Sequence, residues 1–225
     1  MLDIFRENYY KLRGHRLLSR GEFLKAYHFF SKALLITDTP QNVFVLALTL
    51  LSMGRVSEAD QYLTKIQEHF KDNEIFLTTY AECKTLSRNW EEAKEVYRSL
   101  LNLFPNNPVY THYINLLSDP VQREKYTHIR ELITKSDKLS KENNNGEALK
   151  CLQSADEIAP NNALILNNIG SLLLSMRKEP EKILTYFRRA CEIEPANVRY
   201  KKNLLIAAKV IKRSRKSFTT KSAEK

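Results

Sequence analysis

Apolar residues recur along this chain at three- and four-residue steps, in short stretches that end at a proline or a polar turn. In residues 90–107 one apolar stripe contains Ala93, Val96, Tyr97, Leu100, Leu101 and Phe104. Charged residues fill the opposite side of the stretch, as in an amphipathic helix. Pro105 then stops the helix, because proline lacks the amide hydrogen that the next turn needs. The pattern predicts a helix over 90–104 that buries a single face.

The same arrangement occurs five times: a small or apolar residue, a large apolar residue four positions later, and a stop twelve positions after the first. The five copies begin at Ala26, Ala59, Ala93, Ala148 and Ile183, so their spacings are 33, 34, 55 and 35 residues. A period near 34 is typical of a solenoid built from helix pairs. We therefore predict an all-α fold, an α-solenoid of antiparallel helix pairs.

Each unit is predicted to contain a first helix, a tight turn and a second helix. The second helices of the first three units are expected over 23–36, 56–70 and 90–104. Three small residues, Gly14, Ala47 and Ala81, lie in the first helices. Each lies 12 positions before the residue that begins the corresponding copy of the pattern, which is Ala26, Ala59 or Ala93. A small residue there allows two antiparallel helices to approach closely.

The spacing of 55 is one period plus 21 residues, so residues 108–128 are predicted to be an irregular or incomplete repeat. Ser118, Asp119 and Pro120 mark a helix start within it, and one long helix is expected from Val121 to about Glu142. The predicted organisation is repeats over 1–107, the irregular segment or hinge over 108–128, repeats over 129–197, a capping helix over 198–212 and a basic disordered tail over 213–225.

The spacing and the small, aromatic and proline positions resemble the tetratricopeptide repeat family. The resemblance covers most of residues 7–197 and is carried by Gly14, Gly21, Ala26, Phe30, Ala81, Ala93, Tyr97, Pro105, Gly170, Phe187, Ala190 and Pro195, among others. It implies roughly five repeats with a C-terminal capping helix, wound as a right-handed superhelix. It also implies a concave groove lined by the first helices. The tryptophan usual in the first helix is replaced in every unit.

Charge is concentrated at the C-terminal end. Of the formal net charge of +10, residues 198–225 carry +9, while residues 1–197 are nearly neutral. No run of 18 apolar residues occurs, so no membrane-spanning helix is expected, and the N-terminal residues lack the apolar core of a signal peptide. A cytoplasmic protein is expected, with the nucleus as an alternative through the basic tail.

Residue patterns typical of catalysis are missing from the sequence. The five histidines form no His-Glu-x-x-His pattern, and neither a glycine-rich phosphate loop nor a Gly-x-Ser-x-Gly elbow occurs. The three cysteines, Cys83, Cys151 and Cys191, are far apart and give no zinc-type spacing. The sequence therefore predicts a protein that is not an enzyme and that has no cofactor and no metal site.

Carrying the resemblance onto this chain places its peptide-binding positions in both halves of the groove. These positions are Lys11, His15, Phe44, Val45, Leu48, Asn167, Asn168, Arg199, Lys202 and Asn203. The apolar N-terminal half suits an amphipathic helix or an extended apolar peptide; alternatively, its apolar side chains join the core.

In the C-terminal half, Asn168 and Asn203 occupy equivalent positions 35 residues apart. Their amides can both donate to and accept from a peptide backbone, while Arg199 and Lys202 attract an acidic segment. Alternatively, the asparagines align by chance on a polar face.

The expected function is therefore a non-catalytic scaffold or adaptor that binds a peptide segment, acidic or amphipathic, of a partner protein. One alternative rests on the basic tail, which contains Lys209, Lys212, Arg213, Arg215 and Lys216. Such a tail can contact nucleic acid or an anionic membrane with the solenoid as spacer, or it can merely aid solubility. Another alternative is a homo-oligomer, since a solenoid with a weak end can stack on copies of itself.

Overall fold

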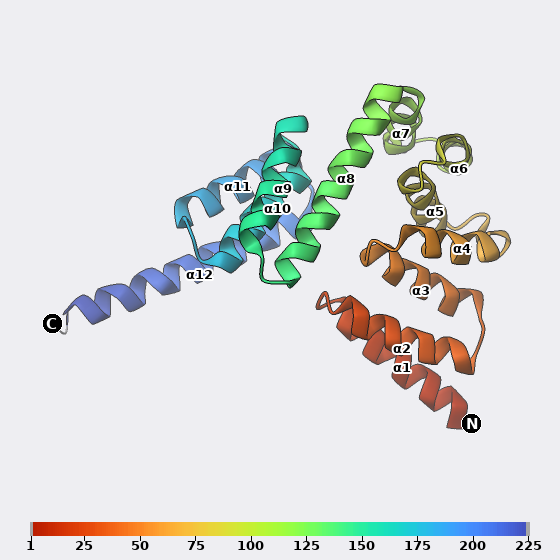
Figure 1. Ribbon diagram of the computed structural model, residues 1–225, viewed down its shortest axis with the longest axis horizontal. Helices are drawn as coiled ribbons and strands as arrows, with labels where there is room; N and C mark the ends of the chain where they lie inside the picture. Colours follow the sequence, from red (N-terminus) through yellow and green to blue (C-terminus); the bar gives the residue numbers. More distant parts are fainter. Residues whose placement is uncertain (1, 224–225) are drawn as a thin grey trace. The chain divides into compact units, whose positions relative to one another are not determined.

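The computed structural model describes residues 2–223, with side chains over 2–213, and every regular element in that range is a helix. The prediction of an all-α helical-repeat fold is confirmed (Figure 1). The helices are α1 (Leu2–Leu18), α2 (Phe23–Ile36), α3 (Pro40–Ser52), α4 (Val56–Ile66), α5 (Glu74–Leu86), α6 (Trp90–Leu103), α7 (Pro108–Ser118), α8 (Pro120–Lys141), α9 (Asn145–Ile158), α10 (Ala163–Met176), α11 (Pro180–Ile193) and α12 (Val198–Ala223). A short 3-10 helix, Gln67–Phe70, extends α4.

The chain divides into two compact units, Met1–Glu124 and Lys125–Lys225. Their boundary lies inside α8, within the segment that the sequence marks as irregular. We call them unit 1 and unit 2.

Unit 1 consists of the helix pairs α1–α2, α3–α4 and α5–α6, with α7 packed on α6. The first helices α3, α5 and α7 lie on one side of unit 1, and the second helices α4 and α6 lie on the other (Figure 1). Apolar stripes of both layers meet in a continuous core whose fully buried members include Phe76, Leu50, Leu63 and Leu100. This is the packing expected of amphipathic helices that each bury one face.

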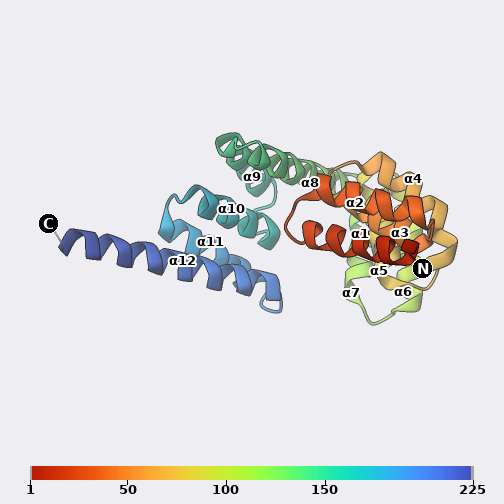
Figure 2. The same cartoon turned by 90° about the horizontal axis from the view of Figure 1, so that it is seen from below.

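Unit 2 contains the later part of α8 and the helices α9 to α12, and Figure 2 shows α9, α10, α11 and α12 following one another in chain order. Leu152, Ile169 and Phe187 form its core, and α12 packs on α10 and α11 through Ala207 and Ile211. The helix α12 does not stop at residue 212 but continues to Ala223, where a disordered tail was expected. Residues 213–223 contain neither glycine nor proline, so nothing in their sequence ends the helix.

The turn inside each helix pair contains at least one residue with left-handed backbone, and the turn between α10 and α11 contains two, Arg177 and Glu179. Gly21 and Gly54 adopt φ of 74° and 75°, and Arg88, Asn143 and Arg177 occupy the corresponding place in later units with φ between 53° and 61°. This conformation costs little for glycine and about 1 kcal/mol or more for residues with a Cβ atom.

We expect Gly21→Ala to lower the free energy of unfolding by about 1 kcal/mol. A Cβ atom at Gly21 would meet nothing within 4 Å, so the cost comes from the backbone alone. The matched control is Gly146→Ala in α9, where the space is equally open but φ is not positive. That change should raise stability by up to about 1 kcal/mol. Urea unfolding of both variants measures the two changes in the free energy of unfolding. If both changes had the same sign, the left-handed backbone at Gly21 would not be the cause of the cost.

Candidate peptide-binding groove

Three asparagines of unit 2 form a chain of amides between α10 and α12. Asn203 Nδ2 donates to Asn167 Oδ1 at 2.8 Å, and Asn167 Nδ2 donates to Asn168 Oδ1 at 3.5 Å. Asn167 is only 1% exposed, whereas Asn168 and Asn203 are half-buried. Asn167 therefore holds α10 and α12 together, and its neighbours lie at the surface.

This arrangement leaves the amide nitrogen of Asn168 and the amide oxygen of Asn203 unused at the surface. Within the described part of the chain, Asn168 Nδ2 and Asn203 Oδ1 have no hydrogen-bond partner. The sequence predicted that Asn168 and Asn203 would act as a pair; the structure joins them through Asn167. A peptide backbone needs one acceptor and one donor from each amide that reads it, and this surface offers both.

Cations accompany the asparagines on α12. Arg199 and Lys202 are exposed, and Arg199 acts electrostatically on Asp137 of α8. Desolvation of the Asp137 carboxyl raises its pKa although the residue as a whole is exposed, and the cations Lys141, Arg199 and Arg130 offset this only in part. Asp137 of α8 therefore lies within electrostatic range of Arg199 of α12.

The predicted binding residues of unit 1 are mostly engaged inside the unit. Phe44 packs against Phe70 and Phe76, with ring centroids 5.8 and 5.3 Å away. Val45 and Leu48 are half-buried. Of the alternatives that the sequence left open for Phe44, the structure favours a part in the core.

Lys11 and His15 of α1 lie at the surface of unit 1 without forming a cluster. Lys11 Nζ is 3.4 Å from Glu7 Oε1 of its own helix, and the exposed His15 ring stands edge-on to Phe30 at 5.1 Å. These two predicted residues therefore face local partners.

The carboxylate of Glu7 is the centre of a polar cluster that sequence reasoning missed. It accepts hydrogen bonds from Thr37 Oγ1 at 2.8 Å and from the buried Asn42 Nδ2 at 3.0 Å. Asn42 also donates to the carbonyl of Thr37 at 2.9 Å. These contacts tie α1 to the start of α3, and the hydrogen bonds from Asn42, then Thr37, lower the pKa of Glu7.

The cluster predicts a specific response to acid. The pKa of Glu7 is lower in the folded state than in the unfolded state, where it is near 4.5. The ionised carboxylate therefore stabilises the fold above about pH 4.5, and this stabilisation is lost as pH falls through the folded-state pKa. We expect Glu7→Gln to lower the free energy of unfolding by about 1 kcal/mol at neutral pH. Below about pH 5, the variant should lose less stability on acidification than the original protein does. Urea unfolding across pH measures this. Glu68→Gln, at an exposed pair with Lys71, is the control and should leave the acid profile in place.

The basic end of the chain is only partly described at the level of side chains. Lys209, Lys212 and Arg213 are exposed on α12. The predicted residues Arg215 and Lys216 have side chains outside the described range.

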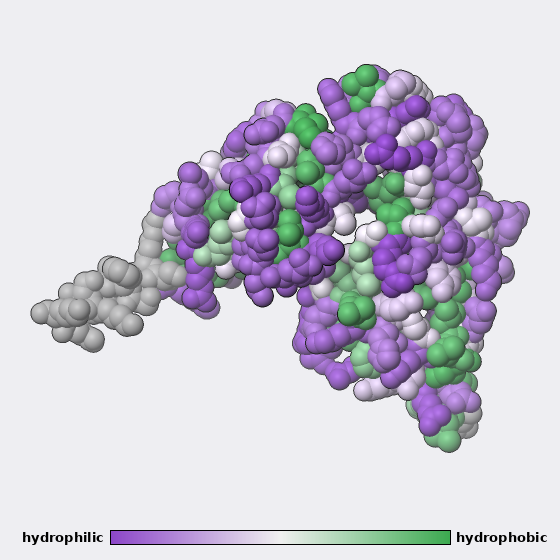
Figure 3. Space-filling model, viewed as in Figure 1, coloured by the Kyte–Doolittle hydropathy of each residue, from purple (hydrophilic) through white to green (hydrophobic). Residues whose placement is uncertain are grey.

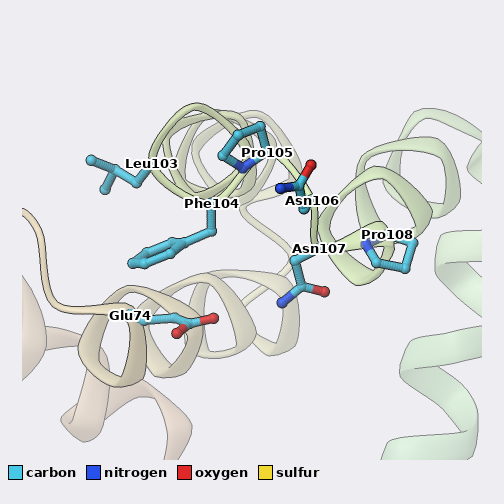
Figure 4. A pocket seen from close by; sticks show the side chains of 7 residues that line it. All are labelled: Glu74, Leu103, Phe104, Pro105, Asn106, Asn107 and Pro108. Carbon is cyan, nitrogen blue, oxygen red and sulfur yellow. The ribbon is translucent and has the colours of Figure 1, made fainter.

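An open hollow lies at the turn between α6 and α7 and is lined by Glu74 and residues 103–108 (Figure 4). The ring of Phe104 and the carboxylate of Glu74 point into the same space in Figure 4. Glu74 accepts a hydrogen bond from the Tyr110 hydroxyl, so its carboxylate is already engaged. The hollow offers no acid–base pair.

Neither a metal-binding group nor a membrane span emerges from the described residues. No three histidine, cysteine, aspartate or glutamate side chains among them converge as metal ligands. None of the described helices combines the length and the apolar character needed to cross a bilayer.

Comparison with known proteins supports the repeat identity of one segment directly. The family model described as tetratricopeptide repeat matches residues 79–107, which contain most of α5 and all of α6. The resemblance expected from the spacing is thereby confirmed at this repeat. Helical repeats of this kind generally serve as protein-interaction scaffolds. No curated protein matches the chain.

Solved structures with a similar helical arrangement share little sequence with this chain. A thermophilic TPR protein of Thermus thermophilus is 17% identical, over 90% of this chain and 98% of its own, with a TM-score of 0.44. The TPR2AB domain of yeast Sti1, in a complex with a pHSP90, is 14% identical over 95% and 87%, with a TM-score of 0.43.

Proposed function

We propose that this protein is a non-catalytic interaction scaffold, and that the first-helix surface of unit 2 binds an extended acidic segment of a partner protein. The observation that carries the proposal is the unused donor of Asn168 and acceptor of Asn203, held in place by the buried Asn167. A side-chain amide can pair with both the N–H and the C=O groups of an extended peptide backbone.

The charges on α12 favour an acidic rather than a basic segment. Arg199 and Lys202 lie on the same helix as Asn203, and α12 contains no aspartate or glutamate between Val198 and Ala223. The Arg199 guanidinium can donate two hydrogen bonds to one carboxylate, and the Lys202 ammonium attracts carboxylates at longer range. The asparagines would then fix the peptide backbone, while the cations select its side chains.

A fluorescein-labelled peptide rich in glutamate and leucine tests this proposal by fluorescence anisotropy. Arg199→Glu/Lys202→Glu should weaken binding by at least about tenfold, because the cations then repel the peptide. Asn168→Ala should weaken it several-fold while leaving the salt dependence unchanged, because a hydrogen bond is lost rather than a charge.

The matched control carries the same change of net charge on the second helix α11, as Lys182→Glu/Arg188→Glu. Both residues are exposed and lie outside the first-helix surface. Binding should stay within about twofold of the original. An equal loss of affinity in this control and in Arg199→Glu/Lys202→Glu would contradict specific binding at this surface.

A second candidate function rests on the basic end of α12. Exposed Lys209, Lys212 and Arg213 continue the positive charge beyond the asparagines, as contact with an anionic polymer or membrane requires. Single-stranded DNA and anionic vesicles in the same assay separate this candidate from the first. Strongly salt-dependent binding that is lost in Lys209→Glu/Lys212→Glu and insensitive to Asn168→Ala would favour it.

A further inference from the structure

The first helix of unit 1 leaves an apolar stripe uncovered. Leu2, Phe5, Tyr9 and Leu12 are 77%, 68%, 53% and 71% exposed, and their spacing of three, four and three residues places them on one face of α1. Figure 3 shows hydrophobic residues gathered toward the end of α1 and α2 that carries the N-terminus. Solenoids usually present a polar outer face at their ends, and a contiguous apolar stripe marks an interaction surface.

The stripe is symmetric about Glu7. Leucine lies at both ends and an aromatic residue lies at both inner positions, so the order reads the same from either end. In an antiparallel pair of such helices, Leu2 would pack on Leu12 of the second copy and Phe5 on its Tyr9. This is the packing of a and d positions in an antiparallel coiled coil, and a twofold axis repeats each contact.

We propose that a second copy of this chain covers the stripe, through antiparallel packing of α1 on α1. Two basic residues of α1 support this orientation. Arg13 and Arg16 are exposed near the end of α1, on the side of the helix that carries the stripe. Antiparallel packing places the two copies of these bases at opposite ends of the interface, whereas parallel packing would bring them side by side. Opposed helix dipoles add to the same preference.

The pairing is weak because the stripe is short. Four such side chains offer on the order of 500 Å² per copy, below the roughly 800 Å² per partner of a stable interface. Arg6 flanks the centre of the stripe and would approach Arg6 of the second copy, although Asp3 of its own helix lies 3.9 Å away. We therefore expect a dimer with a dissociation constant in the micromolar range, about 10 to 100 µM.

Sedimentation equilibrium of the full chain from about 5 to 200 µM tests the association. The expected result is a monomer–dimer equilibrium that Phe5→Glu and Tyr9→Glu each shift to monomer. Leu35→Glu is the control, since Leu35 is 87% exposed on α2 and outside the stripe; this variant should still dimerise. The proposal would be overturned if the original protein were monomeric at every concentration, or if Leu35→Glu lost dimerisation as fully as Phe5→Glu and Tyr9→Glu. Circular dichroism checks that each variant is folded.

Disulfide trapping tests the orientation, in a Cys191→Ser background because Cys83 and Cys151 are buried. A mixture of Leu2→Cys and Leu12→Cys chains should form a crosslinked heterodimer on oxidation, whereas Leu12→Cys alone should not crosslink. Crosslinking of Leu12→Cys alone would overturn the antiparallel register. The acidic-peptide assay of unit 2 should be unaffected by Phe5→Glu, so the two proposals fail or stand separately.

Discussion

Replacing Lys84 with methionine is expected to lower the free energy of unfolding by about 3 kcal/mol, because it leaves two carboxylates without their cation. Lys84 is 4% exposed, in the middle of unit 1. Its Nζ lies 2.9 Å from Asp60 Oδ1, 3.2 Å from Glu92 Oε2 and 3.3 Å from Thr64 Oγ1. The network joins α4, α5 and α6 across two successive repeats.

The size of the effect follows from partial burial. Breaking a fully buried ion pair costs about 3–5 kcal/mol, and the value here lies at the lower end because the Asp60 and Glu92 side chains are 27% and 39% exposed. Desolvation lowers the pKa of Lys84, but the hydrogen bonds to Asp60 and Glu92 outweigh it and raise the pKa above its usual value of 10.5. The stabilisation is therefore complete below about pH 10.5 and disappears as pH rises through the folded-state value.

Urea unfolding of Lys84→Met at neutral pH measures this effect. Lys150→Met is the control, because Lys150 Nζ pairs with Glu147 at 2.7 Å on an exposed surface; its cost should stay below about 0.5 kcal/mol. Equal costs for the two variants would show that the buried network does not stabilise the unit.

The second large effect is expected at Gly14, where alanine should lower the free energy of unfolding by about 2 kcal/mol. A Cβ atom on Gly14 would lie 2.5 to 2.8 Å from three atoms of the Phe30 ring. The ring belongs to α2 and is almost fully buried, so α1 and α2 would have to separate. The gain in helix propensity from glycine to alanine, up to about 1 kcal/mol, offsets only part of this cost.

The equivalent glycine of unit 2 provides a matched comparison. A Cβ atom on Gly170 would lie 3.1 to 3.2 Å from the Phe187 ring, so Gly170→Ala should be nearly neutral. Adding Phe30→Leu to Gly14→Ala should recover part of the lost stability, because the smaller side chain makes room for the methyl group. Additive losses in that double variant would show that the contact between Gly14 and Phe30 is not the cause.

Repeat spacing was sufficient to predict most of the helices and the close helix contacts. The predicted second helix over 23–36 matches α2, and the long helix expected from Val121 to about Glu142 corresponds to α8, Pro120–Lys141. Small residues were predicted where two helices touch, and Gly14 does lie against Phe30. These features depend on local periodicity and on one repeated contact, which the sequence displays directly.

The polar networks could not be predicted because they depend on how helices of different repeats rotate against one another. Glu7 and Asn42 are 35 residues apart, and Lys84 and Asp60 belong to different helix pairs. The asparagine surface shows how fine this dependence is. Asn167 and Asn168 differ by one position, yet one is buried and bonded to Asn203 while the other faces the surface. A one-residue step turns a helical side chain by about 100°, and sequence alone did not determine which of the two would face inward.

The central claim, that unit 2 binds an acidic segment through its first helices, is tested most directly by NMR. Titration of the nitrogen-15-labelled full chain with the glutamate-rich peptide should shift the side-chain amide signals of Asn168 and Asn203 and the backbone signals of α10 and α12 around them. Shifts confined to the second helices α9 and α11, or shifts that leave both asparagine side chains unchanged at saturating peptide, would contradict it.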